Sequence, residues 1–282
     1  MKRIIFGAGR TGQSIASQLL RDPNNDIIGF IDSDQRKWGI RVSDRLVLGG
    51  VESLKNIDFD DVVLGTLAGS SIMKEALIQS GIPLEKINGS FVEGAFVTRR
   101  NFLYDYSFMC ADIDRSIPVA EVGVFQGEFA AAISRAFPGR SFYLFDTFEG
   151  FDARDVAVEI REGFSHSEEK HFSNTTVEEA LSKLENKNLA VVCKGYFPET
   201  TKEVQEDQFL FVSLDVDLYL PTLAGLEYFY PKMVPGGCIL IDDYYGEGYR
   251  GVKAAIDLYE SKCGKLIKCP IGDHSGIAIL KQ

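Results

Sequence analysis

The chain has 282 residues, with 41 Asp and Glu against 30 Lys and Arg, which gives a formal net charge of −11. That average charge would repel nucleic acid and anionic membrane surfaces, so neither is expected as a partner. Hydrophobic residues make up 45% of the chain, as in a folded protein, yet no apolar run reaches the roughly 20 residues of a membrane span. The five cysteines include no CxxC pair, which favours free thiols in a cytoplasmic protein.

Short apolar strands alternate with helices over residues 1–95. The first strand, "RIIF", runs through a glycine turn into a helix that begins at about residue 11. The second, "DIIGFID", ends in Asp32, and the third, "DVVLGT", precedes the helical stretch "SSIMKEALIQSG". This alternation is typical of a parallel sheet with helices on its faces. We therefore expect a Rossmann-like domain over residues 1–95.

The first glycine turn matches a nucleotide-binding pattern. Gly7, Gly9 and Gly12 have the spacing G-x-G-x-x-G between a strand and a helix. Such glycines permit a tight turn and a close backbone approach, and the helix N-terminus attracts phosphate. Asp32 lies 20 residues beyond Gly12, at a strand end, and suits the two hydroxyls of a ribose. The alternative is a degenerate nucleotide fold that binds nothing strongly.

A second series of strands follows the expected connecting helix "TRRNFLYDYSFMC". Its five strands, each apolar and each separated by helical or loop sequence, are "PVAEVGV", "SFYLFDTF", "LAVVCKG", "FLFVSLD" and "GCILIDD". "KLIKCPIG" and "GIAILKQ" close the chain as an antiparallel pair. The fold class we predict is α/β, with two Rossmann-like three-layer α/β/α domains at residues 1–95 and 96–282.

The second glycine turn differs from the first. Glu121 opens it, Gly123 and Gly127 are four residues apart, and no lysine of a triphosphate loop follows. An acidic residue at this place can hold a cationic ligand or orient the loop, and Asp146 at the next strand end suits a ribose diol. A nucleoside with a positive centre and no phosphate describes S-adenosylmethionine. Two ordinary strand-to-helix turns, with Asp146 as a cap, are the alternative.

Carboxylates end two further strands of the second series. Asp215 and Asp217 follow "FLFVSL", and Asp242 with Asp243 follows "CILI". The carboxyl ends of parallel strands open on one edge of the sheet, so these groups should meet near the second glycine turn. Clustered carboxylates repel each other unless they are protonated or bridged by a cation, and oxygen ligands favour Mg²⁺, with Mn²⁺ or Ca²⁺ as alternatives. For any one of them, helix capping is the competing interpretation.

Residues from about 101 to the C-terminus resemble the macrocin O-methyltransferase family, metal-dependent enzymes that methylate sugar hydroxyls on natural products. The matching pieces, in chain order, are "FLYDYSFM", "EVGVFQGEFA", "FDTFEGF", "NTTVEEALSKL", "KGYFPETT", "LDVDLYLPT", "YFYPKMVPGGCILIDDY" and "GVKAAIDLY". The expected sheet also resembles that of catechol O-methyltransferases, whose metal ligands end the corresponding strands. The resemblance implies a class I S-adenosylmethionine-dependent methyltransferase fold for residues 96–282.

Specific roles follow from this resemblance. It implies Asp215, Asp242 and Asp243 as metal ligands and Glu121, Gly123, Gly127 and Asp146 around the cofactor. The catechol enzymes place a lysine three residues after the first ligand, where this chain has Leu218, so their lysine base is not carried over. Related enzymes often self-associate, so a homo-oligomer is compatible with the resemblance.

The chemistry expected is transfer of a methyl group from S-adenosylmethionine to a hydroxyl of a small sugar-containing acceptor. Mg²⁺ would lower the pKa of that hydroxyl and orient it, and Asp215 or Asp217 would take the proton. Alternation along a strand would point both side chains to the same side, unless the chain already turns at Asp217. Lys194 and Gly195 follow the third strand and are expected to line the adenine or the substrate mouth. The charged segment 152–174 is a candidate lid.

The N-terminal block has a resemblance of its own. "GFIDSDQRKWG" and "LVLGG" are similar to the Rossmann-like domains of bacterial polysaccharide and sugar-modifying enzymes. This implies NAD(P) or a nucleotide sugar as ligand. One rival hypothesis is therefore a sugar-nucleotide oxidoreductase or epimerase, although residues 1–95 contain no Tyr-x-x-x-Lys base. The other rival is a non-catalytic nucleotide-binding module.

Overall fold

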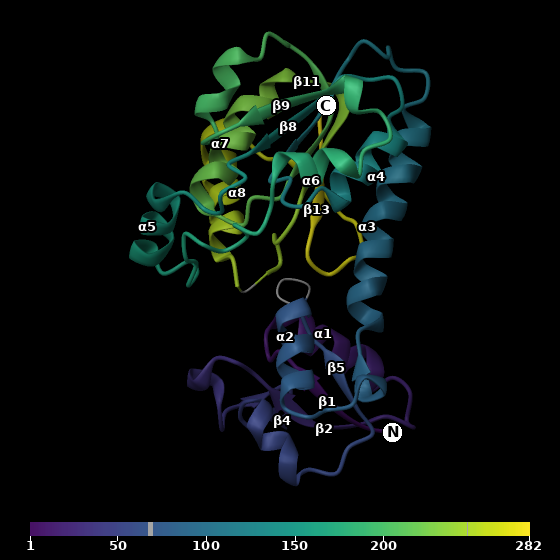
Figure 1. Ribbon diagram of the computed structural model, residues 1–282, viewed down its shortest axis with the longest axis vertical. Helices are drawn as coiled ribbons and strands as arrows, with labels where there is room; N and C mark the ends of the chain where they lie inside the picture. Colours follow the sequence, from purple (N-terminus) through teal and green to yellow (C-terminus); the bar gives the residue numbers. More distant parts are fainter. Residues whose placement is uncertain (67–69, 247) are drawn as a thin grey trace. The chain divides into compact units, whose positions relative to one another are not determined.

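A computed structural model of the chain describes residues 1–66, 70–246 and 248–282 (Figure 1). The fold divides into two compact units, here called the N-terminal unit (residues 1–98 with 273–275) and the C-terminal unit (residues 99–272 with 276–282). The division falls inside one helix, α3 (Ser90–Met109). None of the helices in the described ranges combines the length and the apolar character that a membrane crossing requires.

The N-terminal unit is built on a four-stranded parallel sheet in the order β2-β1-β5-β6. Alternate residues of β1 face opposite sides: Ile5 packs on the α1 side with Ile15, whereas Ile4 and Phe6 share a core cluster with Leu77 of α2. Helices therefore cover both faces. The elements are β1 (Lys2–Phe6), α1 (Arg10–Leu19), β2 (Asp26–Ile31), the hairpin β3 (Arg41–Val42) and β4 (Arg45–Leu46), β5 (Asp61–Leu64), α2 (Ser70–Gln79) and β6 (Ile87–Asn88).

The C-terminal unit contains a seven-stranded sheet in the order β12-β13-β11-β10-β7-β8-β9. The neighbours from β11 to β9 pair in parallel, and β13 pairs antiparallel with both β11 and β12. The strands are β7 (Val119–Val122), β8 (Phe142–Asp146), β9 (Ala190–Lys194), β10 (Phe209–Leu214), β11 (Met233–Ile241), β12 (Ile267–Pro270) and β13 (Ile277–Leu280). The predicted α/β class, including the parallel sheet and the antiparallel pair at the C-terminus, is confirmed.

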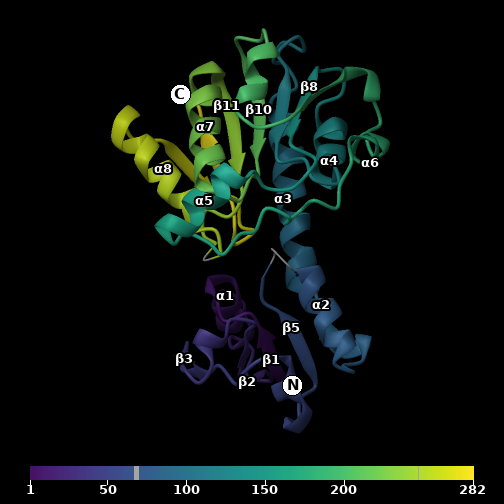
Figure 2. The same ribbon diagram turned by 60° about the vertical axis from the view of Figure 1, so that its left-hand side comes forward.

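Helices cover both faces of this sheet (Figure 2). On one face, Val119 and Leu144 share a core cluster with α3 and α4; on the other, Val122 and Phe145 pack with α7 and α8. The period of two along each strand thus decides which helix layer a side chain meets. The helices are α4 (Glu128–Ala136), α5 (Ala153–Glu162), α6 (Val177–Ser182), α7 (Tyr219–Phe229) and α8 (Arg250–Cys263).

Candidate active site

The second glycine turn requires glycine for packing reasons. Gly123 has φ +85°, and a Cβ built there would lie 1.8 Å from the backbone oxygen of Asp215. Gly127 has φ +87°, and its Cβ would lie 2.7 Å from the Cα of Ala180 in α6. The end of β7 therefore passes directly beside the end of β10, and only a residue without a side chain fits between them. These contacts account for both glycines without any ligand.

Asp146 holds the same turn in place. Its Oδ2 accepts hydrogen bonds from the backbone N–H groups of Val124 (2.7 Å) and Phe125 (2.8 Å), and its Oδ1 accepts one from Phe148 (2.6 Å). This is the capping role that the sequence left as the alternative. Each carboxylate oxygen has two lone pairs, so the predicted contact with a ribose stays a prediction.

The N-terminal unit repeats this arrangement. Oδ2 of the buried Asp32 accepts a hydrogen bond from the backbone N–H of Ala8 (2.8 Å) and pairs with Lys37 Nζ at 3.1 Å. A Cβ on Gly12 would lie 1.9 Å from the backbone oxygen of Gly7, so close packing also explains this glycine. Gly9 is the N-cap of α1. Nucleotide binding by these residues stays a prediction.

Strand alternation brings three acidic side chains to the α3/α4 side of the C-terminal sheet. Glu121 follows Val119 by two residues along β7, and Ser213 is its register partner on β10. Asp215 continues the same alternation beyond β10, and Asp242 follows Leu240 beyond β11. The predicted meeting of Asp215 and Asp242 at the carboxyl edge, which Glu121 joins, therefore has its origin in the period of two along neighbouring parallel strands.

A buried arginine that the sequence analysis missed joins this group. Arg99 of α3 donates from Nη1 to Asp215 Oδ2 (3.1 Å) and to Asp242 Oδ2 (2.6 Å). Its guanidinium carbon lies 4.5 Å from the centre of the Phe129 ring, and the residue is only 6% exposed. A helical pattern could have found it, because Arg99 is four residues before Leu103, which lies on the buried stripe of α3.

Glu121 is the most enclosed acid of the site. It is 1% exposed, and its Oε2 has no hydrogen-bond partner within the part of the chain that the structure describes. Burial, followed by the charge of Asp215, raises the pKa of Glu121 well above its usual value, while Arg99 opposes the shift. A buried carboxyl group with an open oxygen favours a ligand that brings a positive charge or a donor.

Asp217 and Asp243 form a second acidic pair. Both have left-handed backbone angles, with φ of 60° and 54°. Of the two possibilities that the sequence left open, the turn is the one observed, because the extended backbone ends before Asp217. Burial raises the pKa of Asp217 well above its usual value, and a hydrogen bond with Asp243 and the charge of Asp215 add to the shift. Two carboxyl groups that share one proton are expected here.

No group of three or more His, Cys, Asp or Glu side chains placed to hold a metal ion is found in residues 1–66, 70–246 and 248–282. The predicted ligand set Asp215, Asp242 and Asp243 is thus not assembled as a metal centre. Arg99 Nη1 instead contacts two of the three carboxylates, Asp215 and Asp242.

The last residue of β9, Lys194, and the following Gly195 lie beside the end of β8. The backbone N–H of Gly195 donates to the backbone oxygen of Asp146 (2.9 Å). Lys194 Nζ pairs with Glu149 Oε1 at 2.9 Å, and both side chains are largely exposed. Gly195 therefore lies beside the strand end that carries Asp146, whereas Lys194 is at the surface. Their predicted contact with the cofactor stays a prediction.

The candidate lid is anchored to the glycine turn. The ring of Phe172 lies 5.3 Å from that of Phe125 and 5.4 Å from that of Phe151. Gln126 Nε2 donates to the backbone oxygen of Asn174 (2.8 Å). At its other end, the fully buried Glu159 of α5 accepts from the backbone N–H of Tyr219 (2.7 Å). Segment 152–174 thus packs beside the turn, and its function as a lid stays a prediction.

A buried acid in α5 gives the first testable prediction. Burial raises the pKa of Asp155 to about 6 from its ordinary 3.8, although a hydrogen bond from the Tyr196 hydroxyl (3.0 Å) opposes the shift. Neutral Asp155 makes its full contribution to the free energy of unfolding below pH 3.8, and this contribution is lost as the pH rises through about 6. Asp155→Asn should therefore be more stable than the parent at pH 8, by about 2 kcal/mol, and equally stable at pH 4.

Urea denaturation at the two pH values measures this difference. A variant whose stability relative to the parent is the same at both pH values would contradict the assigned titration. Asp207→Asn, at an exposed position, is the matched control.

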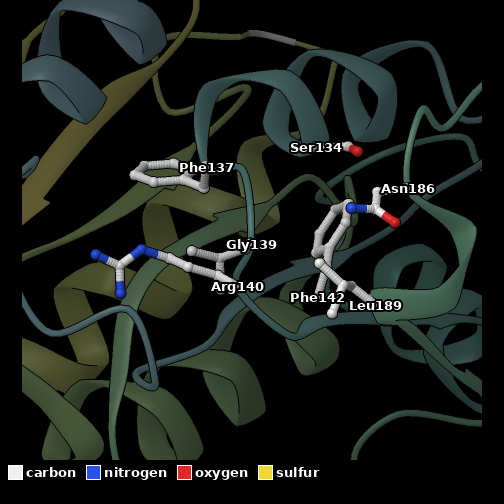
Figure 3. Close-up of a pocket in the computed structure, with 8 residues that line it drawn as sticks. Ser134, Phe137, Gly139, Arg140, Phe142, Asn186 and Leu189 are labelled. Carbon is white, nitrogen blue, oxygen red and sulfur yellow. The ribbon is translucent and has the colours of Figure 1, made fainter.

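A small pocket lies at the opposite end of the C-terminal sheet (Figure 3). Val119 and Phe142, the first residues of β7 and β8, line it together with Asn186. Arg140 extends away from Asn186 and donates to the backbone oxygens of residues 113, 114 and 117, which fixes the loop before β7. This pocket is at the amino ends of the strands, so it is separate from the carboxylates described above.

Two protein families match this sequence, one in each part of the chain. Residues 115–278, more than half of the chain, match the model of the family macrocin-O-methyltransferase (TylF). The chain belongs to the macrocin O-methyltransferase family. The predicted resemblance is thereby confirmed for the C-terminal unit. Residues 1–88 match the family C2185-like, N-terminal, which does not test the ligand expected there.

Individual proteins share limited sequence identity with this member of the macrocin O-methyltransferase family. The solved structure of the O-methyltransferase NovP is 22% identical, covers 66% of this chain and 80% of its own, and has a TM-score of 0.54, which shows a shared fold. A curated relative from Streptomyces olivaceus, 8-demethyl-8-(2,3-dimethoxy-alpha-L-rhamnosyl)-tetracenomycin-C 4'-O-methyltransferase, is 32% identical over 85 residues. That match spans 30% of this chain and 31% of the relative's length.

Proposed function

We propose that this chain is an S-adenosylmethionine-dependent O-methyltransferase that acts on a hydroxyl of a sugar-containing small molecule. The observation that carries the proposal is Glu121, a buried carboxyl with an open oxygen at the end of β7, directly before the glycine turn. The family match over residues 115–278 supports the reaction type. The Streptomyces olivaceus relative is named for methylation at a 4' position of a rhamnosyl tetracenomycin, which supports the acceptor class.

The proposed cofactor fits the residues at the carboxyl edge. S-adenosylmethionine, when bound, supplies the methyl group on a positively charged sulfur. Glu121 would favour that charge, because burial and Asp215 make its ionised form costly until a cation is near. Asp146 fixes the Gly123 turn beside β8 and would offer its remaining lone pair, on Oδ1, to a ribose. Gly195 lies against the same strand end.

Asp217 is the residue we propose as the base. Its raised pKa, caused by burial and then by Asp243, makes its ionised form a stronger base than an ordinary aspartate. Asp215 is less suited to this role, because its Oδ2 already accepts from Arg99. The left-handed backbone at Asp217 turns the chain away from the strand direction, as often found at functional sites.

A divalent cation remains part of the proposal. Mg²⁺ or Mn²⁺ would act as a Lewis acid and orient the acceptor hydroxyl. The donors fit such an ion chemically, since all four aspartates offer hard oxygens. Asp243 with Asp215 and Asp242 would hold it once the guanidinium of Arg99 no longer occupies the latter two. Asp217 lies next to this set through its hydrogen bond with Asp243.

The direct test combines binding and turnover. Calorimetry of the purified chain with S-adenosylhomocysteine should give saturable binding, and Glu121→Ala should weaken it about tenfold or more because it removes the buried carboxyl group proposed to contact the ligand. Methyl transfer from labelled S-adenosylmethionine is then measured on nucleotide sugars and on glycosides, with and without EDTA. Absence of S-adenosylhomocysteine binding would refute the proposal. Transfer that is unchanged by EDTA would refute only the metal part.

A nucleotide-binding function for the N-terminal unit is a separate proposal. It is supported by the position of Asp32, which reaches the glycine turn through the backbone N–H of Ala8. Calorimetry with NAD(P) and with nucleotide sugars tests it. Binding that persists when Asp32 is replaced by Asn and Gly9 by Val would contradict this site.

A further inference from the structure

Arg99 has an unusual position for a charged residue. Spacings of four, three and four align it with Leu103 and Tyr106 of α3 and with Cys110 just beyond the helix end, all of them buried. Removing a guanidinium from water is costly unless charges and hydrogen bonds replace the hydration. Here the Phe129 ring and two carboxylates provide that replacement.

The carboxylates of Asp215 and Asp242 are also stabilised by the positive charge of Arg99. Asp215 and Asp242 follow paired strands, since Leu214 is the register partner of Ile241. Their side chains are partly shielded from water, with exposed fractions of 30% and 20%. Like charges that are this close and this shielded raise the free energy of the folded state unless a cation lies between them. One nitrogen, Arg99 Nη1, contacts both.

We infer that Arg99 is the internal counter-ion of Asp215 and Asp242 and that it competes with a divalent cation for their oxygens. This inference rests on the proposed function, because it concerns the cation of that same site. Arg99 is a positioning residue: it fixes the two carboxylates while no metal is bound and must leave at least one of them when a metal arrives. The metal affinity of the chain is therefore lower than its four carboxylates alone would give.

Direct metal binding tests the competition without any cofactor or acceptor. Mn²⁺ titration followed by electron paramagnetic resonance gives the dissociation constants of the parent, Arg99→Met and Arg99→Lys. Arg99→Met should bind Mn²⁺ about tenfold more tightly, because two carboxylates lose their cation while the apolar stem remains. Arg99→Lys should stay close to the parent. Arg100→Met, on the exposed neighbour, is the control and should change nothing.

Equal or weaker Mn²⁺ binding by Arg99→Met would overturn the inference, as would no binding by any variant. If Arg99→Met does not fold, the parent supplies the measurement. The Nε–H signal of Arg99, assigned by its absence in Arg99→Lys, should shift in step with Mg²⁺ saturation. A signal that stays in place while Mg²⁺ binds would overturn the inference. S-adenosylhomocysteine calorimetry in the presence of EDTA reports the proposed methyltransferase function separately from metal binding.

Discussion

Replacing Gly123 with alanine should lower the free energy of unfolding of the C-terminal unit by about 4 kcal/mol or more. The new Cβ would lie 1.8 Å from the backbone oxygen of Asp215, and φ is +85°. Neither strand end can retreat easily, because the backbone N–H of Asp215 donates to Val122 at 2.9 Å. Urea denaturation followed by circular dichroism measures the loss.

Gly139 supplies a matched control for this substitution. It also has a positive φ, of +81°, but a Cβ there would meet nothing within 4 Å. Gly139→Ala should therefore cost only the strain of the left-handed backbone, about 1 kcal/mol. If the two variants lose equal stability, the close approach of β7 and β10 is not what requires glycine at position 123.

Replacing Asp217 with asparagine should reduce methyl transfer by about 10²- to 10⁴-fold, because it removes the proposed base. The affinity for S-adenosylhomocysteine should stay within a few-fold of the parent, since Glu121 and Asp146 are unchanged. Single-turnover kinetics and calorimetry separate the two effects. An unchanged rate would remove Asp217 from the mechanism, and a parallel loss of cofactor binding would indicate a structural role.

Stability gives this variant a second readout. The folded-state pKa of Asp217 is raised, first by burial and then by Asp243. Stability linked to its neutral form is complete at pH values below about 3.9 and is lost as the pH rises through the folded-state pKa. The asparagine side chain of the variant stays neutral, so Asp217→Asn should be more stable than the parent at pH 8, and this advantage should disappear near pH 3. A catalytic loss combined with a gain in stability is typical of a functional carboxylate.

Much of the site could be predicted from sequence because it follows local rules. Apolar runs that end in Asp215 and Asp242 mark strand ends, and parallel pairing then places those ends together. The ion pairs of Arg99 could not be predicted in this way, because Arg99 precedes Asp215 by 116 positions and Asp242 by 143 positions in the sequence. The left-handed backbone of Asp217 could not be predicted either, since the apolar-polar pattern of a sequence does not indicate a positive φ at a residue other than glycine.

The helix α3 has a consequence for the design of protein fragments. Its first turns belong to the N-terminal unit and its later turns to the C-terminal unit, and Asn88 Oδ1 accepts from the backbone N–H of Ser90 (3.1 Å) at its start. A truncated gene that opens at codon 99, where the compact units divide, would cut this helix and leave Arg99 at a fraying end. A recombinant fragment that contains the C-terminal unit should therefore begin no later than Asn88, so that it keeps both the Asn88 hydrogen bond at the start of α3 and the buried Arg99.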